Sequence, residues 1–283
     1  LITNQSKRLK ELNSAFHLEK EKINNKNLMP FYEDGTIVGP FVHHISEDIY
    51  TSILLHAEGW KSYQHPDVEC KMLSPQTLPA FIKQFSRYAE GTFQLFFSKE
   101  NPLIKKGLGF WQRLAYFETI YSYFSPFWLL VFLFSPVIFF FSLTPPIMAF
   151  NFDFFLRFLI FNLLNVVIVT LGNWGIPTKR SEQYYIGGFW FKLKAFLKVV
   201  FGGKIIFNPT VKGVGKETFF QRIKPVIPHF AIAALTFIGF AYNAVLIYKN
   251  LHPSYSAFVA NSIWSCYNLY QINPIMRAAF IKS

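Results

Sequence analysis

The chain has two patterns of polar and apolar residues. Up to about residue 125, apolar residues recur at helical spacing among many charged ones, which predicts amphipathic surface helices. Beyond that point the apolar runs become long. A membrane's hydrocarbon core is about 30 Å thick and needs about 20 residues of helix to cross it. The pattern therefore predicts a polar first part followed by membrane-crossing helices.

Amphipathic helices account for most of the polar part. Ser46 is an N-cap candidate, and Glu47 and Asp48 follow it in the first turn, where acids suit the helix dipole. This helix is expected to end before Gly59. Residues 31–45 and 61–74 are expected to form a loop and a short strand with a loop. The predicted helices cover roughly residues 9–23, 47–58, 80–98 and 108–124.

Four apolar segments predict about four transmembrane helices. Pro136 lies inside the first and predicts a kink. The fourth is interrupted by polar residues, which in lipid usually face a protein interior or an aqueous path. These polar residues are Asn261, Ser262, Ser265, Asn268 and Gln271. The four segments are 126–147, 154–171, 229–248 and 257–272.

The distribution of charge predicts the orientation of these helices. The turn at 145–153 has no Lys or Arg, whereas residues 173–228 contain ten against two Glu, a net charge of +8. Because basic residues accumulate in cytoplasmic segments, the turn is expected outside and the polar part inside. Within 173–228, residues 188–201 mix lysines with apolar side chains, as interfacial helices do. We therefore expect an integral protein of the plasma membrane or a bacterial inner membrane, with its polar side cytoplasmic.

Composition agrees with a membrane protein. Of 283 residues, 52% are hydrophobic and 35 are Phe, which is too apolar for an ordinary soluble domain. The net charge of +12 accompanies no nucleic-acid module, and its basic residues flank apolar segments, so no nucleic-acid partner is expected. Cys70 and Cys266 lie in regions of different character and predict neither a disulfide nor a zinc site. The chain begins with Leu and is expected to lack an N-terminal part.

Two short polar groups are candidates for chemistry. Glu47 and Asp48 start one helix, and Gln84 and Arg87 lie three apart on one side of another, next to Tyr88. Periodicity alone leaves two interpretations open for each group. The acids either cap their helix or act in a site, and the arginine is either solvated on an amphipathic helix or binds a ligand.

Three motifs carry a resemblance to a known family. Ser46-Glu47-Asp48 resembles the TED motif of processive family-two glycosyltransferases, 84–88 resembles QxxRW, and the loop 207–213 resembles FxVTxKG. The chain is similar, over roughly residues 40–275, to the C-terminal half of a cellulose synthase catalytic subunit. Ser46 replaces Thr, Tyr88 replaces Trp, and Pro209 replaces Val, which stiffens the loop.

The resemblance implies a fold and a division of the chain. The fold is an α-helical membrane protein, in which the C-terminal part of a cytoplasmic α/β glycosyltransferase domain of GT-A type precedes interfacial and about four transmembrane helices. The implied segments are 1–100 (glycosyltransferase domain), 101–125 (interfacial helix), 126–172 (two transmembrane helices), 173–228 (cytoplasmic interfacial helix and gating loop), 229–273 (two transmembrane helices) and 274–283 (cytoplasmic tail).

The resemblance also assigns roles to the motif residues. Asp48 is implied as the general base that takes a proton from the acceptor hydroxyl, with Glu47 shaping the site. Arg87 and Gln84 are implied as donors to the diphosphate, and Tyr88 as a flat surface for the terminal sugar. A lid over the nucleotide is implied for Phe207, Thr210 and Lys212.

The implied reaction is inverting, processive transfer of glucose from UDP-glucose to a growing β-1,4-glucan, coupled to translocation of the polymer. The implied partners are UDP-glucose, the glucan, the lipid membrane and accessory synthase subunits. A divalent cation, Mg²⁺ or Mn²⁺, is expected, but the chain contains no Asp-x-Asp pair, so its ligands and most of the donor pocket are expected outside this chain. The alternatives are a synthase of chitin, hyaluronan or another β-glucan, and a non-catalytic membrane transporter or scaffold.

Overall fold

A computed structural model describes residues 45–63, 74–146, 152–175, 178–203 and 217–281. It also describes the backbone of a two-stranded antiparallel hairpin, β1 (Tyr32–Glu33) and β2 (Thr36–Ile37), within the predicted loop at 31–45. The predicted helix near residues 9–23, the gating loop, Cys70 and most of the predicted strand at 61–74 lie outside these residues.

Apart from this hairpin, the regular structure of the described residues is helical. The helices predicted at 47–58, 80–98 and 108–124 are confirmed to within a few residues. Thr77 rather than a later residue caps α3, because its side chain accepts a hydrogen bond from the Ala80 N–H at 3.3 Å. The helices are α2 (Glu47–Ala57), α3 (Leu78–Phe96), α4 (Phe110–Tyr123), α5 (Ser125–Ser142), α6 (Phe152–Gly172), α7 (Lys179–Gly187), α8 (Phe189–Val200), α9 (Phe219–Ile223), the 3₁₀ turn η2 (Lys224–Val226), α10 (Ile227–Tyr248) and α11 (Tyr255–Ala278).

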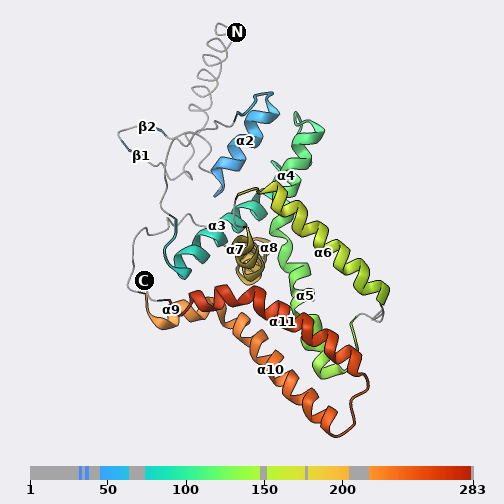
Figure 1. Cartoon of the computed structure of the whole chain (residues 1–283). Helices are drawn as coiled ribbons and strands as arrows, with labels where there is room; N and C mark the ends of the chain where they lie inside the picture. The colour runs from blue at the N-terminus through green and yellow to red at the C-terminus, as the bar shows by residue number, and fades with distance from the viewer. Residues whose placement is uncertain are drawn as a thin grey trace.

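The helices form two connected groups. α5, α10 and α11 pack against one another around a core that includes Leu133, Ile232 and Ile272. α8 contacts both α5 and α3, and so joins this group to α2, α3 and α4 (Figure 1). A second core, built on Phe93 and Ala195, lies between α3 and α8. The polar part of the chain thus sits at one end of the long helices.

Two of the four predicted spans are long and apolar enough to cross a membrane by length and composition. They are α5 and the 30 residues Phe219–Tyr248, which include α10. The predicted second span is helical, and Leu159–Gly172 is a shorter apolar helix whose large side chains are mostly exposed. α11 is a 24-residue helix, but its polar residues keep its mean hydropathy below that of the two candidate spans. The second and fourth spans therefore stay predictions.

Proline residues interrupt the backbone hydrogen bonds of these helices, and a neighbouring helix replaces the missing bonds. Pro136 has no N–H, so the carbonyl four residues earlier, on Phe132, loses its helical partner. The Asn268 side chain of α11 donates to that carbonyl at 3.1 Å. Lipid offers no hydrogen bonds, so this contact matters for a helix that crosses a membrane.

The same substitution of partners occurs twice more. Pro126 leaves the Ser122 carbonyl without a helical donor, and the Tyr185 hydroxyl of α7 donates to it at 2.7 Å. Pro274 similarly frees a carbonyl in α11. Gln183 of α7, which is buried, donates to that carbonyl, on Tyr270, at 3.2 Å. The helices are therefore connected by side-chain to backbone hydrogen bonds at their proline positions.

One arginine fixes the loop that leads into α4. The Arg113 guanidinium donates to four backbone carbonyls of the preceding loop, at distances from 2.5 to 3.1 Å. Its planar set of donors suits such multiple contacts. These carbonyls belong to Pro102, Leu103, Lys105 and Leu108. The loop and the start of α4 therefore form one rigid unit beside α2.

Candidate active site at the start of α2

The two candidate acids lie at the exposed N-terminus of α2. One carboxylate oxygen of Asp48 accepts a hydrogen bond from the Ile49 N–H at 2.8 Å, and the Ser52 hydroxyl donates to the Asp48 carbonyl at 2.8 Å. Ser46 occupies the predicted N-cap position, but its side chain makes no capping hydrogen bond. It is instead 5% exposed, because it packs against the next helix.

A glycine allows this close packing of α2 on α3. A Cβ atom on Gly91 would lie 1.9 Å from the Ser46 Oγ and 2.6 Å from the Ile45 Cγ2, which no packed structure tolerates. Further along, Ile53 of α2 and Leu95 of α3 share a buried cluster. The motif that starts α2 is therefore held against the helix that carries the second motif.

The polar residues of the second motif are half-buried next to one another on α3. The Gln84 side-chain amide donates to the Tyr88 hydroxyl at 2.6 Å, and the Arg87 guanidinium lies 5.5 Å from the centre of the Tyr88 ring. Cation–aromatic contacts of this length are attractive. The three side chains predicted to share one site are thus confirmed as neighbours, while their roles stay predictions.

Tyr123, the last residue of α4, connects the two motifs. Burial raises the pKa of its phenol, a hydrogen bond with the Thr92 side chain lowers it, and the nearby Tyr88 and Asp48 raise it further. Thr92 in turn donates to the Tyr88 carbonyl at 2.9 Å. Asp48 and Tyr88 therefore both act electrostatically on Tyr123, although the three residues come from three helices.

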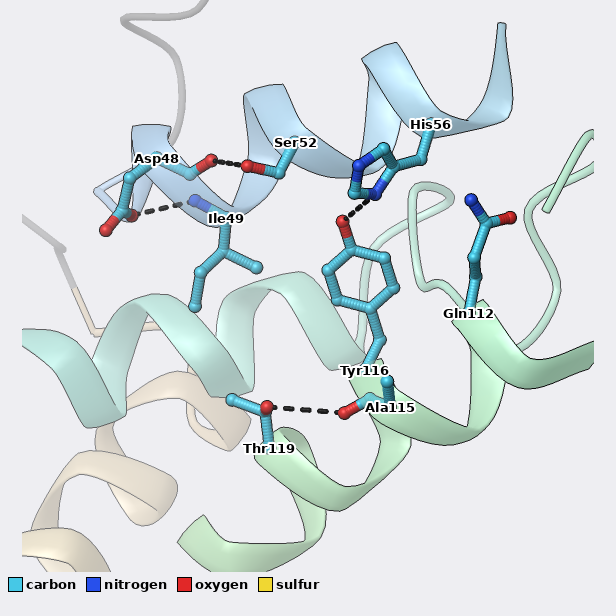
Figure 2. A pocket seen from close by; sticks show the side chains of 8 residues that line it. All are labelled: Asp48, Ile49, Ser52, His56, Gln112, Ala115, Tyr116 and Thr119. Atoms are coloured by element: carbon cyan, nitrogen blue, oxygen red, sulfur yellow. Dashed lines mark hydrogen bonds between the residues drawn. The ribbon is translucent and has the colours of Figure 1, made fainter. Parts of the chain in front are cut away.

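An open hollow of about 420 Å³ extends from this point between α2 and α4. Figure 2 shows Asp48 at one end and Gln112 at the other, with α2 on one side and α4 on the other. Ser52 and Thr119 add hydroxyl groups, and Ile49 adds an apolar surface. A hollow with these linings suits a ligand that carries many hydroxyl groups.

A histidine and a tyrosine brace the far part of the hollow. The His56 Nδ1 lies 2.8 Å from the Tyr116 hydroxyl (Figure 2). The His56 Nε2 lies 3.1 Å from the Ser62 hydroxyl. Burial raises the pKa of the Tyr116 phenol, so it stays protonated. The tautomer of His56 sets which group donates in each of these two hydrogen bonds.

The sequence interpretation missed Tyr123, Tyr116 and His56. A usable signal was present for α4, where residues 112, 116, 119 and 123 recur at the spacing of one helix face. The predicted lid residues lie outside the described part of the chain, so their relation to the hollow stays a prediction. These residues are Phe207, Thr210 and Lys212.

The described residues do not offer a metal site. Among them there is no group of three or more His, Cys, Asp or Glu side chains that could hold a metal ion. Asp48 and Glu47 are adjacent carboxylates, but no third ligand joins them within this part of the structure. The described residues therefore do not form a site for the divalent cation by themselves, and the resemblance places its ligands outside this chain.

Comparison with known proteins supplies the family. A family model described as cellulose synthase matches residues 5–282. The chain belongs to the cellulose synthase family. Among curated members, cellulose synthase-like protein D2 of Oryza sativa subsp. indica is 28% identical over 278 residues, which cover 87% of this chain and 23% of the relative. Cellulose synthase-like protein D3 of Arabidopsis thaliana is 26% identical over 277 residues, covering 87% and 24%.

This cellulose synthase family chain spans about a quarter of the length of the curated relatives it matches. The resemblance carried by the three motifs is thus confirmed at the level of the family. The match covers α2 to α11 within 5–282, so the site and the long helices lie in the shared region.

Proposed function

We propose that this chain forms the acceptor side and the membrane path of a processive synthase that transfers glucose from UDP-glucose to a growing β-1,4-glucan. The observation that carries the proposal is the position of Asp48. Gly91 allows the helix of Asp48 to pack closely against α3, and the carboxylate acts electrostatically on Tyr123 beside the open hollow. Membership of the cellulose synthase family supports the class of reaction.

Asp48 takes the role of general base in this proposal. The attacking hydroxyl of the glucan must lose its proton as it bonds to the sugar carbon, and a carboxylate within reach can accept it. The diphosphate leaves from the opposite side, so the configuration at that carbon inverts. Asp48 is exposed at a helix start and lines the hollow, where a hydroxyl-bearing chain end can reach it.

The polar residues of α3 hold the reactants. Arg87 offers a rigid multi-donor group for the departing diphosphate, and Gln84 adds a neutral donor. The Tyr88 ring offers the terminal sugar a flat apolar face, while Gln84 occupies its hydroxyl. Donor-sugar and cation binding are assigned to residues outside this chain, and the steps given to Asp48, Arg87 and Tyr88 do not depend on a metal.

The long helices provide the path for the polymer in this proposal. α5 and the segment that contains α10 have the length and composition to cross a membrane, and they pack with α11. The polar side of the chain, which holds Asp48, lies at one end of them (Figure 1). Product made at Asp48 therefore emerges next to the helices, on the cytoplasmic side that the charge pattern predicts.

The test is Asp48→Asn in the complete synthase, reconstituted in lipid vesicles. The amide cannot accept the proton, so polymer formation should fall by at least about a thousandfold while UDP binding persists. Glu47→Gln, which changes the neighbouring carboxylate, is the matched control and should lose much less. Wild-type yield from the Asn variant would contradict the assignment.

The identity of the product is tested separately. Digestion with a β-1,4-specific glucanase should release the labelled sugar from wild-type product. Resistance to that enzyme, with digestion by a chitinase or hyaluronidase, would assign the chain to another processive synthase. A wild-type protein that binds UDP-glucose but yields no polymer would favour a non-catalytic scaffold or transporter.

A further inference from the structure

The buried cation Lys192 has no role in the proposed reaction. It lies on α8, was expected to face the interface, and is instead 5% exposed between the buried residues Phe191 and Ala195. Lysine is almost never fully buried without a partner, because its ammonium loses its hydration. Its burial therefore needs an explanation from its surroundings.

The surroundings of Lys192 are aromatic rather than acidic. Its Nζ lies 3.5 Å from the centre of the Tyr185 ring and 5.9 Å from that of Tyr123, and it donates to the Ser125 hydroxyl at 3.1 Å. Among the described residues no carboxylate pairs with it. Contacts between a cation and aromatic rings are strongest when both are shielded from water.

These contacts lie at the break between α4 and α5. Pro126 frees the Ser122 carbonyl there, and the Tyr185 hydroxyl donates to it at 2.7 Å. The Ser125 hydroxyl is also hydrogen-bonded to Tyr185. Lys192 of α8 and Tyr185 of α7 thus pack against the proline break from one side. They fix the angle at which α4 meets α5.

Tyr123 lies at this break and also in the candidate site. It is the last residue of α4, and its ring packs on Phe93 of α3 at a centroid distance of 6.5 Å. Its phenol is bonded to Thr92 and acts electrostatically on Asp48. A shift of the break would therefore move a side chain that borders the candidate base.

We propose that Lys192 is a positioning residue of the acceptor site, whose ammonium group holds Tyr185 and Tyr123 at the break between α4 and α5. Through Tyr123 it fixes the wall of the site beside Asp48. The inference rests on the proposed function, because the acceptor site is the part of the reaction that it serves.

Protonation of Lys192 gives the proposal a distinctive readout. Burial lowers the pKa of Lys192 to about 7. The side chain therefore loses its charge in a pH range, above about 7, in which an exposed lysine stays charged. The titratable groups that face it are the phenols of Tyr123 on α4 and Tyr185 on α7. The Lys192 ammonium also donates a hydrogen bond to the Ser125 hydroxyl of α5. The Tyr88 phenol of α3 acts electrostatically on Tyr123.

The experiment compares Lys192→Met and Lys192→Arg with wild type in vesicles of the complete synthase, using labelled UDP-glucose. Methionine fills the space without charge, and kcat should fall about tenfold with the KM for UDP-glucose changed by less than about twofold. Arginine stays charged and should restore at least about half of kcat. Lys194→Met, an exposed lysine on the same helix, is the matched control and should match wild type.

The pH profile separates positioning from a merely structural role. Wild-type kcat should decline above about pH 7 as the ammonium loses its proton, whereas the Arg variant should lack this decline. Unchanged kcat in Lys192→Met, or the same alkaline decline in wild type and Lys192→Arg, would overturn the proposal. If the Met variant does not fold, the comparison of wild type with the Arg variant decides.

Failure of the proposed function gives a different result. In that case wild type yields no polymer, or Asp48→Asn yields as much as wild type, and the inference is overturned together with the function. Polymer from wild type, loss in Asp48→Asn and full kcat in Lys192→Met would overturn the inference alone.

Discussion

Polar side chains serve opposite purposes in the two groups of helices. Between α2 and α4 they face an open hollow, where Asp48, Ser52 and Thr119 can meet a ligand. At the long helices they turn toward backbone, as Asn268 of α11 does toward the Phe132 carbonyl of α5 and Gln183 of α7 does toward the Tyr270 carbonyl of α11. A polar residue in an apolar helix is therefore no sign of a solute path by itself. The group to which it is hydrogen-bonded shows whether it faces the protein interior or an open space.

The fourth predicted span illustrates the point. Its polar residues were expected to face a protein interior or an aqueous path, and Asn261, Ser265, Asn268 and Gln271 are all buried in the structure. Asn261 donates to the Ala257 carbonyl of its own helix at 2.9 Å. Their burial agrees with the first of these two expectations, whereas the polar groups of the α2–α4 hollow face an open space.

The largest expected effect concerns the contact that holds α2 on α3. Gly91→Ala would place a methyl group 1.9 Å from the Ser46 Oγ, so α2 must move and carry Asp48 with it. A displacement of about 1 Å at a reacting group can cost about a hundredfold in rate, and we expect a loss of that size in polymer synthesis.

Gly172→Ala is the control for that change, because a Cβ there meets no atom within 4 Å. Its activity should equal that of wild type. If the two alanine variants have similar activity, the close contact between α2 and α3 is not what positions Asp48.

A stability effect with a defined pH range is expected for Lys192. Its pKa is about 7 in the fold and 10.5 in the unfolded chain, so between these values the unfolded chain holds one more proton. Stability therefore rises with pH in this range and is independent of this group below it. Relative to Lys192→Met, wild type should gain about 2 kcal/mol between pH 7 and 9.

Thermal unfolding in detergent at several pH values measures this difference. The Lys194→Met variant again provides the reference, since that side chain is exposed. Parallel stability curves for wild type and Lys192→Met would show that the ammonium is not buried in solution.

A smaller effect is expected at the sugar-facing ring of α3. Tyr88→Ala removes the flat surface and the partner of Gln84, and elongation should slow about tenfold. Tyr88→Trp keeps a broad aromatic face and should lose less, as measured by product length in a pulse of labelled UDP-glucose. Equal losses in the two variants would argue against stacking on the sugar.

The smallest effect is expected among the long helices. Asn268→Leu leaves the Phe132 carbonyl without a donor and should destabilise the fold by about 1 kcal/mol. Cys266→Ala, at an exposed position of the same helix, should change stability far less. Unfolding in mild detergent measures the stability of both variants. If the two variants are equally stable, the hydrogen bond from Asn268 does not replace the one lost at Pro136.

Local pattern predicted the helices well, because their signals are local. The acids of α2, Gly59 after it and Pro79 near the start of α3 mark helix ends within a few residues. The pairing of Gln84 with Tyr88 also follows from spacing along one helix. The sequence could therefore predict the members of the candidate site that share an element.

Contacts between elements could not be predicted in this way. Gly91 has no local reason to be glycine, since its role appears only when Ser46 packs on it. Lys192 sits in an amphipathic pattern that predicts an exposed ammonium, whereas the proline break at Pro126 makes room for it in the interior. Such positions depend on the tertiary arrangement of α4, α5, α7 and α8.

The replaced hydrogen bonds at the prolines bear on the order in which the protein is made. α5 emerges from the ribosome before α11, and Pro136 leaves one of its carbonyls, on Phe132, without a helical donor. The donor that replaces it, Asn268, is synthesised roughly 130 residues later. Because lipid supplies no substitute, we expect α5 to stay in contact with water or with an insertion partner until α11 arrives. Pro136 therefore ties completion of the first long helix to synthesis of the last.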